Sequence, residues 1–369
     1  MMKFEEEPYR VGILGATGAV GQQFVELLMK HPWLTVETLG GSERTVGKTY
    51  KAATGARMPS CSLSPLSDET IMSCTCDEFE DCDLVFSALD SSVAGEIERN
   101  FADHGFPVFS NAKNHRNDTD VPILLPLVNP SHLDIVTSQA TFVQNNGFIV
   151  TNANCSSTGL TIAVAPIHRT FGISKMAIST LQAVSGAGYP GLSALDIIDN
   201  VIPFIKDEEE KLETEPNKIL GTYNGDTIQH ESIIASAACH RVGVSDGHIV
   251  SVSLKLQNLS ISPALKPVEL LSLVRQSIIS FPIPSEVQQL PSCPEYAIKL
   301  FNEIDRPQPK KDRMIGDGMT VCIGRLRNCP LFDVKMTILS NNMIVGAAGG
   351  SILNAELAIS RGYIPRRVC

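Results

Sequence analysis

The 369-residue sequence lacks an excess of basic residues and lacks long apolar runs. Its 30 Lys and Arg against 40 Asp and Glu leave a net charge of −10, which argues against a nucleic-acid or anionic-membrane partner. The acidic first ten residues, MMKFEEEPYR, contain no apolar segment, so we expect no signal peptide. No apolar run approaches the length of a bilayer span. We therefore expect a soluble, cytoplasmic protein.

The cysteines show no secretory or metal-binding pattern. Ten are scattered along a chain without secretory features, so reduced thiols are expected. CTC at 74–76, with Cys82 nearby, fits no common zinc spacing. We predict no metal site.

The first part of the chain alternates short apolar runs with amphipathic stretches. RVGILGA at 10–16 predicts a buried strand, 19–31 has helical apolar spacing, and LTVETLGG at 34–41 predicts a second strand. Further strands are expected at 82–89, 106–112 and 147–154. Alternating strands and helices joined by glycine-rich turns predict an α/β fold with a doubly wound parallel sheet.

The pattern changes after Cys155. Longer alternating strands are predicted at 175–186, 247–258, 319–327 and 331–340. They favour an antiparallel or mixed sheet with one covered face. A proline-rich stretch at 281–313 is expected to be a loop or arm, and 349–362 a helix that packs back on the first domain.

A glycine loop lies between the first strand and the first helix. In GILGATGAVG at 12–21, Gly15, Gly18 and Gly21 have the spacing of a Rossmann-type dinucleotide loop, in which the helix N-terminus receives a pyrophosphate. The alternative is a tight turn with no ligand. After the second strand, Ser42 and Arg44 stand where a 2′-phosphate would bind, which favours NADP. Glu43 remains compatible with a ribose contact, and Arg44 alone is also typical of a solvated surface.

Cys155 follows a predicted strand in TNANCSSTGL, 151–160. The next residues predict a helix that begins at Ser156 or Ser157, so we expect the helix field to lower the pKa of the thiol. Asn154 and nearby backbone N–H groups are candidates to hold an oxyanion. The alternative is a buried structural cysteine. His248, which starts a strand after an Asp-Gly turn, is the candidate base, although a lone histidine is more often structural.

A thiol beside a nicotinamide site suggests acyl or aldehyde chemistry through a thioester or thiohemiacetal. Taken together, seven motifs in this order make the sequence resemble the aspartate-β-semialdehyde dehydrogenase family, closest to its fungal and archaeal branch: GATGAVG, SNAKNHR, NANCSSTG, QAVSGAGYPG, EEEKLETEPNKILG, RVGVSDGH and VGAAGGSILNAELA. The resemblance implies NADPH-dependent reduction of L-4-aspartyl phosphate to aspartate semialdehyde, with release of phosphate. That step belongs to threonine and methionine biosynthesis.

The resemblance also implies roles for single residues. Cys155 is similar to the family's nucleophile, His248 to its acid/base catalyst, and Gln182 to its substrate-orienting glutamine. Arg241, seven residues before His248, would clamp the substrate carboxylate, which a planar guanidinium does well. Cys155, His248, Gln182 and Asn154 are thus the predicted catalytic residues.

Further substrate contacts are implied by two polar segments. Glu208 and Lys211 match a Glu-x-x-Lys pair, the glutamate for the substrate ammonium and the lysine for the phosphate. The acidic run leaves the choice among Glu208, Glu209 and Glu210 open, and without the resemblance this run is typical of a solvated helix face. Arg116 matches the phosphate-binding arginine, with Asn111 and Lys113 as helpers. The alternative is that these residues form a charged loop after a strand, with no ligand.

For the cofactor, the resemblance implies NADP. The predicted contacts are Gly15, Thr17, Gly18, Ala19 and Val20 in the loop, Ser42 and Arg44 at the ribose, and Ser87, Ser185, Gly186, Gly188 and Asn342 nearer the nicotinamide.

Two domains follow. We predict an NADP-binding domain at 1–154, completed by a C-terminal helix in 342–369, and an α+β catalytic and dimerisation domain with a mixed sheet at 155–341. A homodimer or homotetramer is expected. The rival functions are a related reductase, acting on N-acetyl-glutamyl phosphate or malonyl-CoA, and an inactive NADP-binding redox sensor.

Overall fold

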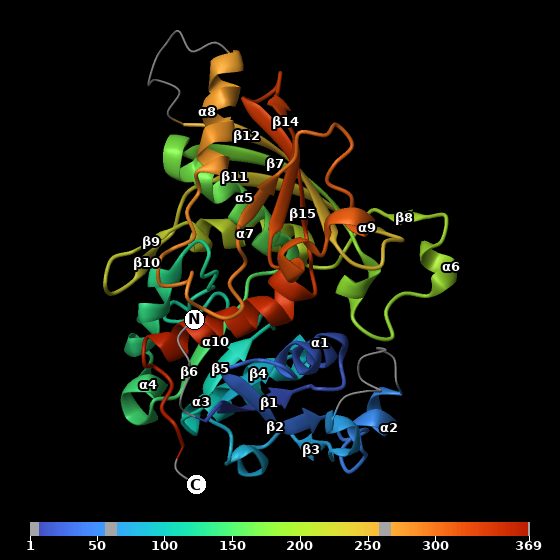
Figure 1. Cartoon of the computed structure of the whole chain (residues 1–369), viewed down its shortest axis with the longest axis vertical. Coiled ribbons are helices and arrows are strands. Elements are labelled where there is room, and N and C mark those ends of the chain that lie inside the picture. Colours follow the sequence, from blue (N-terminus) through green and yellow to red (C-terminus); the bar gives the residue numbers. More distant parts are fainter. Residues whose placement is uncertain (1–6, 56–64, 258–266, 368–369) are drawn as a thin grey trace.

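The computed structural model describes residues 7–55, 65–257 and 267–367, which fold into two sheets and their helices (Figure 1). The sheet in the lower half of Figure 1 has six strands, all parallel, in the order β3-β2-β1-β4-β5-β6. This order is that of a doubly wound dinucleotide-binding sheet, so the predicted Rossmann-type fold is confirmed. Its strands are β1 (Tyr9–Leu14), β2 (Leu34–Gly41), β3 (Met72–Ser73), β4 (Leu84–Ser87), β5 (Pro107–Ser110) and β6 (Phe148–Thr151).

Both faces of this sheet are buried. Along β4, Val85 packs with one apolar cluster, whereas Leu84 and Phe86 on the opposite face belong to another. Such strands are apolar at consecutive positions because no face meets water. The helices of this half are α1 (Ala19–Leu28), α2 (Tyr50–Thr54), α3 (Ser91–Asp103) and α4 (Ala140–Asn145).

The second sheet is mixed, as predicted. It has seven strands in the order β13-β14-β15-β12-β7-β11-β8, with parallel pairing in β7/β11 and β13/β14 and antiparallel pairing elsewhere. The strands are β7 (Ile173–Gln182), β8 (Val201–Ile202), β11 (Ile234–Val242), β12 (His248–Leu256), β13 (Ile298–Leu300), β14 (Val321–Asn328) and β15 (Val334–Ser340). A small hairpin joins β9 (Thr222–Tyr223) to β10 (Ile228–Gln229).

Helices cover one face of the second sheet. They include α5 (Cys155–Phe171), which is buried along most of its length, α7 (Glu208–Ile219) and α8 (Pro267–Ile279). Short helices α6 (Ala194–Ile197) and α9 (Pro309–Asp312) lie in connecting segments. The stretch at 281–313 is therefore a loop interrupted by α9 and β13. The sequence analysis predicted a loop over this stretch, and it did not predict the short elements α9 and β13 within it.

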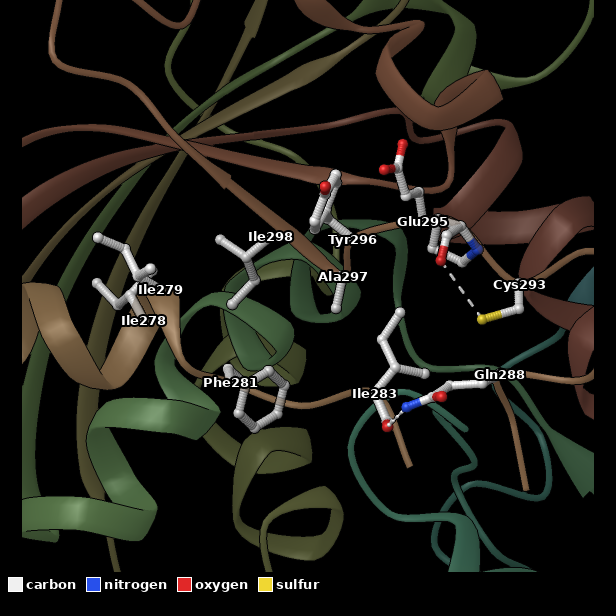
Figure 2. A pocket seen from close by; sticks show the side chains of 11 residues that line it. Ile278, Ile279, Phe281, Ile283, Gln288, Cys293, Glu295, Tyr296, Ala297 and Ile298 are labelled. Carbon is white, nitrogen blue, oxygen red and sulfur yellow. Dashed lines mark hydrogen bonds between the residues drawn. The ribbon is translucent and has the colours of Figure 1, made fainter. Parts of the chain in front are cut away.

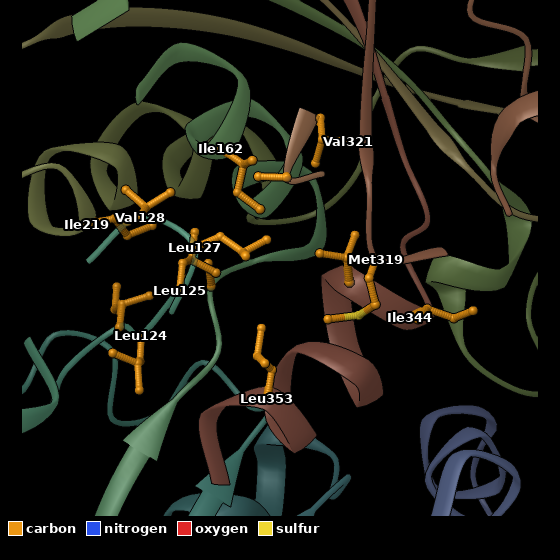
Figure 3. Close-up of a cluster of buried hydrophobic side chains, with 14 of the residues drawn as sticks. Leu124, Leu125, Leu127, Val128, Ile162, Ile219, Met319, Val321, Ile344 and Leu353 are labelled. Atoms are coloured by element: carbon orange, nitrogen blue, oxygen red, sulfur yellow. The ribbon is translucent and has the colours of Figure 1, made fainter. Parts of the chain in front are cut away.

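The C-terminal segment returns to the first sheet. A short π-helical turn (Ile344–Ala348) leads into α10 (Gly349–Ser360), whose residues are buried up to Ile359. Asn354 donates to the Asn152 side chain just after β6, at 2.8 Å. Figure 3 shows that one apolar cluster contains side chains from both halves, among them Ile162, Met319 and Leu353. The two halves thus share a continuous core. In the described parts of the chain, no helix is long and apolar enough to cross a bilayer.

Candidate active site

The thiol of Cys155 lies at the first residue of α5, one residue earlier than the predicted helix start. The helix starts there because the side chain of Asn154 caps it, accepting from the N–H groups of Ser156 and Ser157 at 2.9 and 3.1 Å. The other end of that amide donates to Glu208 at 2.7 Å. The side chain of Asn154 and the N–H groups of Ser156 and Ser157 are thus hydrogen-bonded to one another in the helix cap. They were expected to hold an oxyanion, and in this arrangement they form the cap instead.

His248 is the partner of the thiol. Its Nε2 lies 3.3 Å from Sγ of Cys155. His248 is fully buried and Cys155 half-buried, where the ends of β12, β7 and α5 meet. The backbone N–H of Ala183 donates to Nδ1 at 3.1 Å, so a neutral ring carries its proton on Nε2. This tautomer directs an N–H donor at the sulfur.

The expected fall in the pKa of Cys155 is wrong. Burial raises the pKa of the thiol to about 12, with Glu208 adding to the rise and Arg241, Lys211 and Arg116 opposing it. Burial likewise lowers the pKa of His248 to about 3. The helix field that the sequence indicated is therefore outweighed by the desolvation of the thiol.

Arg241 and Gln182 stand at paired positions on neighbouring strands, at the ends of β11 and β7. Nη1 of Arg241 donates to the carbonyl of Ala183 at 2.7 Å, and the amide of Gln182 donates to Thr180 at 3.3 Å. A Cβ at position 186 would lie 2.8 Å from Nη1 of Arg241 and 3.1 Å from the His248 ring, so a larger residue there would displace the guanidinium.

Helix α7 settles which acidic side chain faces the thiol. Glu208 is buried, accepts from Lys211 at 3.1 Å and borders the same cavity as the thiol. Glu209 instead accepts from the backbone of Cys239 in β11, and Glu210 is exposed. Of the three candidates, the geometry favours Glu208.

The loop after β5 brings further charges to the site. Arg116 is buried and donates from Nη2 to the carbonyl of Asn111 at 3.0 Å. The side chain of Asn111 donates to Ser351 of α10 at 3.2 Å. Lys113, in this loop, forms an ion pair with Asp207, the residue before α7; the distance from Nζ to Oδ2 is 2.6 Å.

Two buried charged residues of α7 were not singled out by the sequence analysis. Glu215 accepts from Arg116 and from the backbone N–H of Asn154. Lys218 donates to three carbonyls of the 116–121 loop, including that of Arg116, and burial lowers its pKa to about 8. Both belong to the motif EEEKLETEPNKILG, and the seven-residue spacing places Glu215 on the same helix face as Glu208.

The glycine loop fits a dinucleotide. Gly15 has φ of +78°, and a Cβ there would lie 2.8 Å from the carbonyl of Ala88. At Gly21 a Cβ would lie 2.3 Å from the carbonyl of Gly15, so α1 sits close against the loop. Helix α1 begins after Gly18 without a side-chain cap and without an acidic residue in its first turn. Its N–H groups, including those of Ala19 and Val20, suit an anion.

The other predicted cofactor residues are less uniform in their placement. Ser42 and Arg44 are exposed just past the end of β2, as a ribose-phosphate site requires. Ser87 ends β4, but its hydroxyl donates to the buried Glu98 at 2.6 Å rather than facing a ligand. Asn342 donates to the hydroxyl of Ser185 at 2.8 Å and so holds the segment that carries Gly186 and Gly188.

One cavity, of about 490 Å³, connects these groups, and we call it the thiol cavity. It extends from Val20 of the nucleotide-binding helix to Cys155. The other predicted residues that line it are Asn111, Lys113, Arg116, Asn154, Ser185, Gly186, Gly188, Glu208, Lys211 and Asn342. Gln182, Arg241 and His248 lie buried behind its wall, around Gly186 and Cys155.

A second cavity, of about 350 Å³, lies between α8 and the segment that leads to β13 (Figure 2). Its side chains include Ile278, Phe281 and Ile283, with Cys293 at one end. The Sγ of Cys293 contacts the carbonyl of Pro294 at 3.5 Å, whereas that of Cys155 has a histidine beside it. Among the described residues, no group of three or more His, Cys, Asp or Glu could hold a metal ion. The thiol cavity is therefore the candidate active site.

Comparison with known proteins agrees with this geometry. The model of the semialdehyde dehydrogenase NAD-binding domain matches residues 10–136, and that of the semialdehyde dehydrogenase dimerisation domain matches 164–345. The aspartate-semialdehyde dehydrogenase of Aspergillus fumigatus is 46% identical over 96% of this chain and 98% of its own length. That of Archaeoglobus fulgidus is 42% identical over 96% and 99%.

Solved structures give the same result. The Candida albicans aspartate semialdehyde dehydrogenase with NADP has a TM-score of 0.87 at 40% identity, covering 97% of this chain and all of that one. The Vibrio cholerae aspartate semialdehyde dehydrogenase II complexed with ASA has a TM-score of 0.71 at 25% identity, covering 96% and 99%. The resemblance seen in the sequence is confirmed, and the chain belongs to the aspartate-semialdehyde dehydrogenase family.

Proposed function

We propose that the protein reduces L-4-aspartyl phosphate to L-aspartate 4-semialdehyde with NADPH, releasing phosphate and NADP, in aspartate-family amino-acid biosynthesis. The observation that carries the proposal is the Cys155–His248 pair, 3.3 Å apart, beside a cavity that reaches the nucleotide-binding helix at Val20. A reactive thiol within reach of a nicotinamide is what acyl-phosphate reduction through a thioester requires. The family membership and the NADP-bound relative support the same reaction.

The charges around the thiol match the substrate. Aspartyl phosphate carries an α-carboxylate, an ammonium group and a phosphate. We assign Arg241 to the carboxylate, Glu208 to the ammonium, and Lys211 with Arg116 to the phosphate. All four side chains are anchored by hydrogen bonds to the scaffold or to one another. Holding the substrate at three corners fixes its carbonyl against the sulfur, and such positioning contributes several kcal/mol to barrier reduction.

The chain's own groups carry the acyl transfer. Cys155 attacks the acyl phosphate carbon as its proton is lost, the C–O bond to phosphate breaks, the phosphate leaves with that proton as hydrogen phosphate, and a thioester remains on the sulfur. Arg241, Lys211 and Arg116 oppose the effect of burial on the thiol pKa and so favour the thiolate. The Nε2–H of His248 donates to the sulfur anion as it forms and again as it leaves. When bound, NADPH supplies the hydride that reduces the acyl group. Lys113, which lines the cavity, and Gln182, buried behind its wall, would help to orient the substrate.

We propose that Arg44 and Ser42 select NADPH over NADH. Their exposed side chains follow β2, where a 2′-phosphate would meet them. Replacing Arg44 by alanine should raise the KM for NADPH by about tenfold, since a charge-assisted contact is worth about 1.5–3 kcal/mol. The KM for NADH should stay within twofold. Steady-state assays with each nucleotide measure both values, and a wild-type enzyme with a lower KM for NADH would contradict the assignment.

Arg241→Lys tests the carboxylate contact. Lysine keeps the charge but cannot make a paired contact with a carboxylate, so the KM for aspartate semialdehyde should rise by about 10–100-fold. The KM for NADP should stay close to the wild-type value, because Arg241 at the end of β11 takes no part in the glycine loop after β1 or in the Ser42 and Arg44 site after β2. Initial rates at varied semialdehyde concentration measure the effect. A change confined to the KM for NADP would remove Arg241 from the substrate site.

The decisive assay of function is phosphate-dependent reduction of NADP by the purified protein with aspartate semialdehyde, the convenient reverse direction. N-acetyl-glutamyl semialdehyde with phosphate, and malonyl semialdehyde with coenzyme A, test the two rival reductases in parallel. Turnover with aspartate semialdehyde that requires phosphate supports the proposal. Turnover with only a rival substrate, or NADP binding without any turnover, refutes it.

A dimerisation domain is present, and we propose that two copies pair through the open face of the second sheet. This face carries small exposed side chains such as Ser179, Ala238 and Ser251 on three adjacent strands, which permits close approach of a flat partner. Further association into a tetramer remains part of the proposal.

We also propose a domain boundary between residues 154 and 155, with 342–369 completing the first domain. We propose a cytoplasmic location as well, which the eight free thiols among the described cysteines support.

A further inference from the structure

Glu215 is a buried carboxylate to which the reaction as proposed gives no role. It lies on α7, seven residues after Glu208, so both side chains project from one helix face, and Glu208 lines the thiol cavity. Only 6% of its side chain is exposed. A buried carboxylate is costly unless charged and hydrogen-bonding partners compensate it, so its contacts indicate what it is there for.

Each oxygen of Glu215 contacts a different part of the site. Oε1 accepts from Nη1 of Arg116 at 2.7 Å. Oε2 accepts from the backbone N–H of Asn154, also at 2.7 Å. Asn154 immediately precedes Cys155 and caps the helix that carries it. A single carboxylate therefore joins the arginine assigned to the phosphate to the residue that holds the nucleophile.

The surroundings make this connection rigid. Arg116 also donates to the carbonyl of Asn111, and its own carbonyl accepts from Lys218 at 2.8 Å. Lys218 lies three residues after Glu215 on α7 and contacts two more carbonyls of the same loop. The Arg116 guanidinium is thus held in place by α7, while its edge still borders the thiol cavity.

We infer that Glu215 is a positioning residue that sets the Arg116 guanidinium relative to the Cys155 sulfur, and so aligns the phosphate for departure and attack. The inference rests on the proposed function, because it presupposes that Arg116 receives the phosphate. Glu215 touches neither the substrate nor the cofactor. Its effect should therefore appear in phosphate binding and in turnover, and be absent from NADP binding.

Glu215→Gln tests this inference with little change in volume. The amide has only one acceptor oxygen, so its NH₂ group must face either Arg116 or the N–H of Asn154, both of which are donors. In the phosphate-dependent assay we expect the KM for phosphate to rise at least tenfold and kcat to fall, with the KM for NADP within twofold of wild type. Glu96→Gln, an equal charge change at an exposed site on α3, is the matched control and should leave all three constants unchanged.

A second comparison separates positioning from general destabilisation. In an Arg116→Lys background the contact through which Glu215 acts is already altered, so adding Glu215→Gln should change the KM for phosphate by less than threefold. Glu215→Asp, which keeps the charge but is one methylene shorter, should give an intermediate KM and serves if the glutamine variant fails to fold. Wild-type phosphate KM in both Glu215 variants, or full additivity with Arg116→Lys, overturns the inference. A wild-type enzyme that does not need phosphate would instead refute the proposed function.

Discussion

Replacing Cys155 by serine is expected to reduce kcat by about 10⁴-fold or more, because the chemistry depends on a covalent bond to the sulfur. A serine hydroxyl ionises far less readily than a thiol, and the buried position of Cys155 already disfavours the anion. NADP binding should persist, since the glycine loop lies in the other half of the chain and does not involve the thiol.

Two measurements check this result. Turnover is followed by NADP reduction with aspartate semialdehyde and phosphate, and NADP affinity by titration calorimetry. Cys293→Ser is the control, because this half-buried thiol lies in the cavity beside α8 and should be dispensable. Near-normal turnover in the Cys155 variant would rule out the thioester route.

His248→Asn is expected to lower kcat by about 10²–10⁴-fold. Asparagine is shorter than histidine and places no donor at the position of Nε2, so the sulfur loses its 3.3 Å neighbour. The Ala183 N–H also loses its acceptor at Nδ1 unless the asparagine oxygen replaces it. Single-turnover rates of acylation and of product release should both fall, while the KM for NADP stays near wild type. Loss of NADP binding alone would contradict this role.

The tautomer of His248 adds a sharper test. If the ring acts by donating from Nε2, His248→Gln should retain more activity than His248→Asn, because the glutamine amide reaches the position of Nε2. If the ring must instead accept and return a proton, both variants should be equally impaired. Comparing kcat for the two variants distinguishes a donor from an acid/base catalyst.

Much of the fold was readable from local pattern. The strand at 34–41 and the helix from Ala19 were predicted within a few residues, because apolar periodicity and glycine punctuation agree there. The short elements β13 and α9 were missed within the proline-rich stretch. Three residues pairing with β14 carry no periodic signal of their own, so only the tertiary context identifies them as a strand.

For the site, the sequence identified the principal residues but not their pKa values or all of their partners. Motif order located Cys155 and His248, and the structure brings them together. The pKa of Cys155 was not predictable, because it depends on how much of the second half of the chain buries the thiol, and the helix end alone does not reveal this. Glu215 was missed because an acidic run on a helix ordinarily faces water. Its partners, Arg116 and Asn154, lie 99 and 61 residues away in the sequence.

The apolar cluster shared by the two halves limits how ligands can enter. Because Ile162, Met319 and Leu353 pack into one body, a wide hinge rotation between the sheets would expose a large apolar area to water. The half-exposed ion pair of Lys113 and Asp207 lies at the rim of the thiol cavity and joins the loop after β5 to the residue before α7. We therefore expect substrate to enter through side-chain movements at this rim rather than through a rotation of one sheet relative to the other.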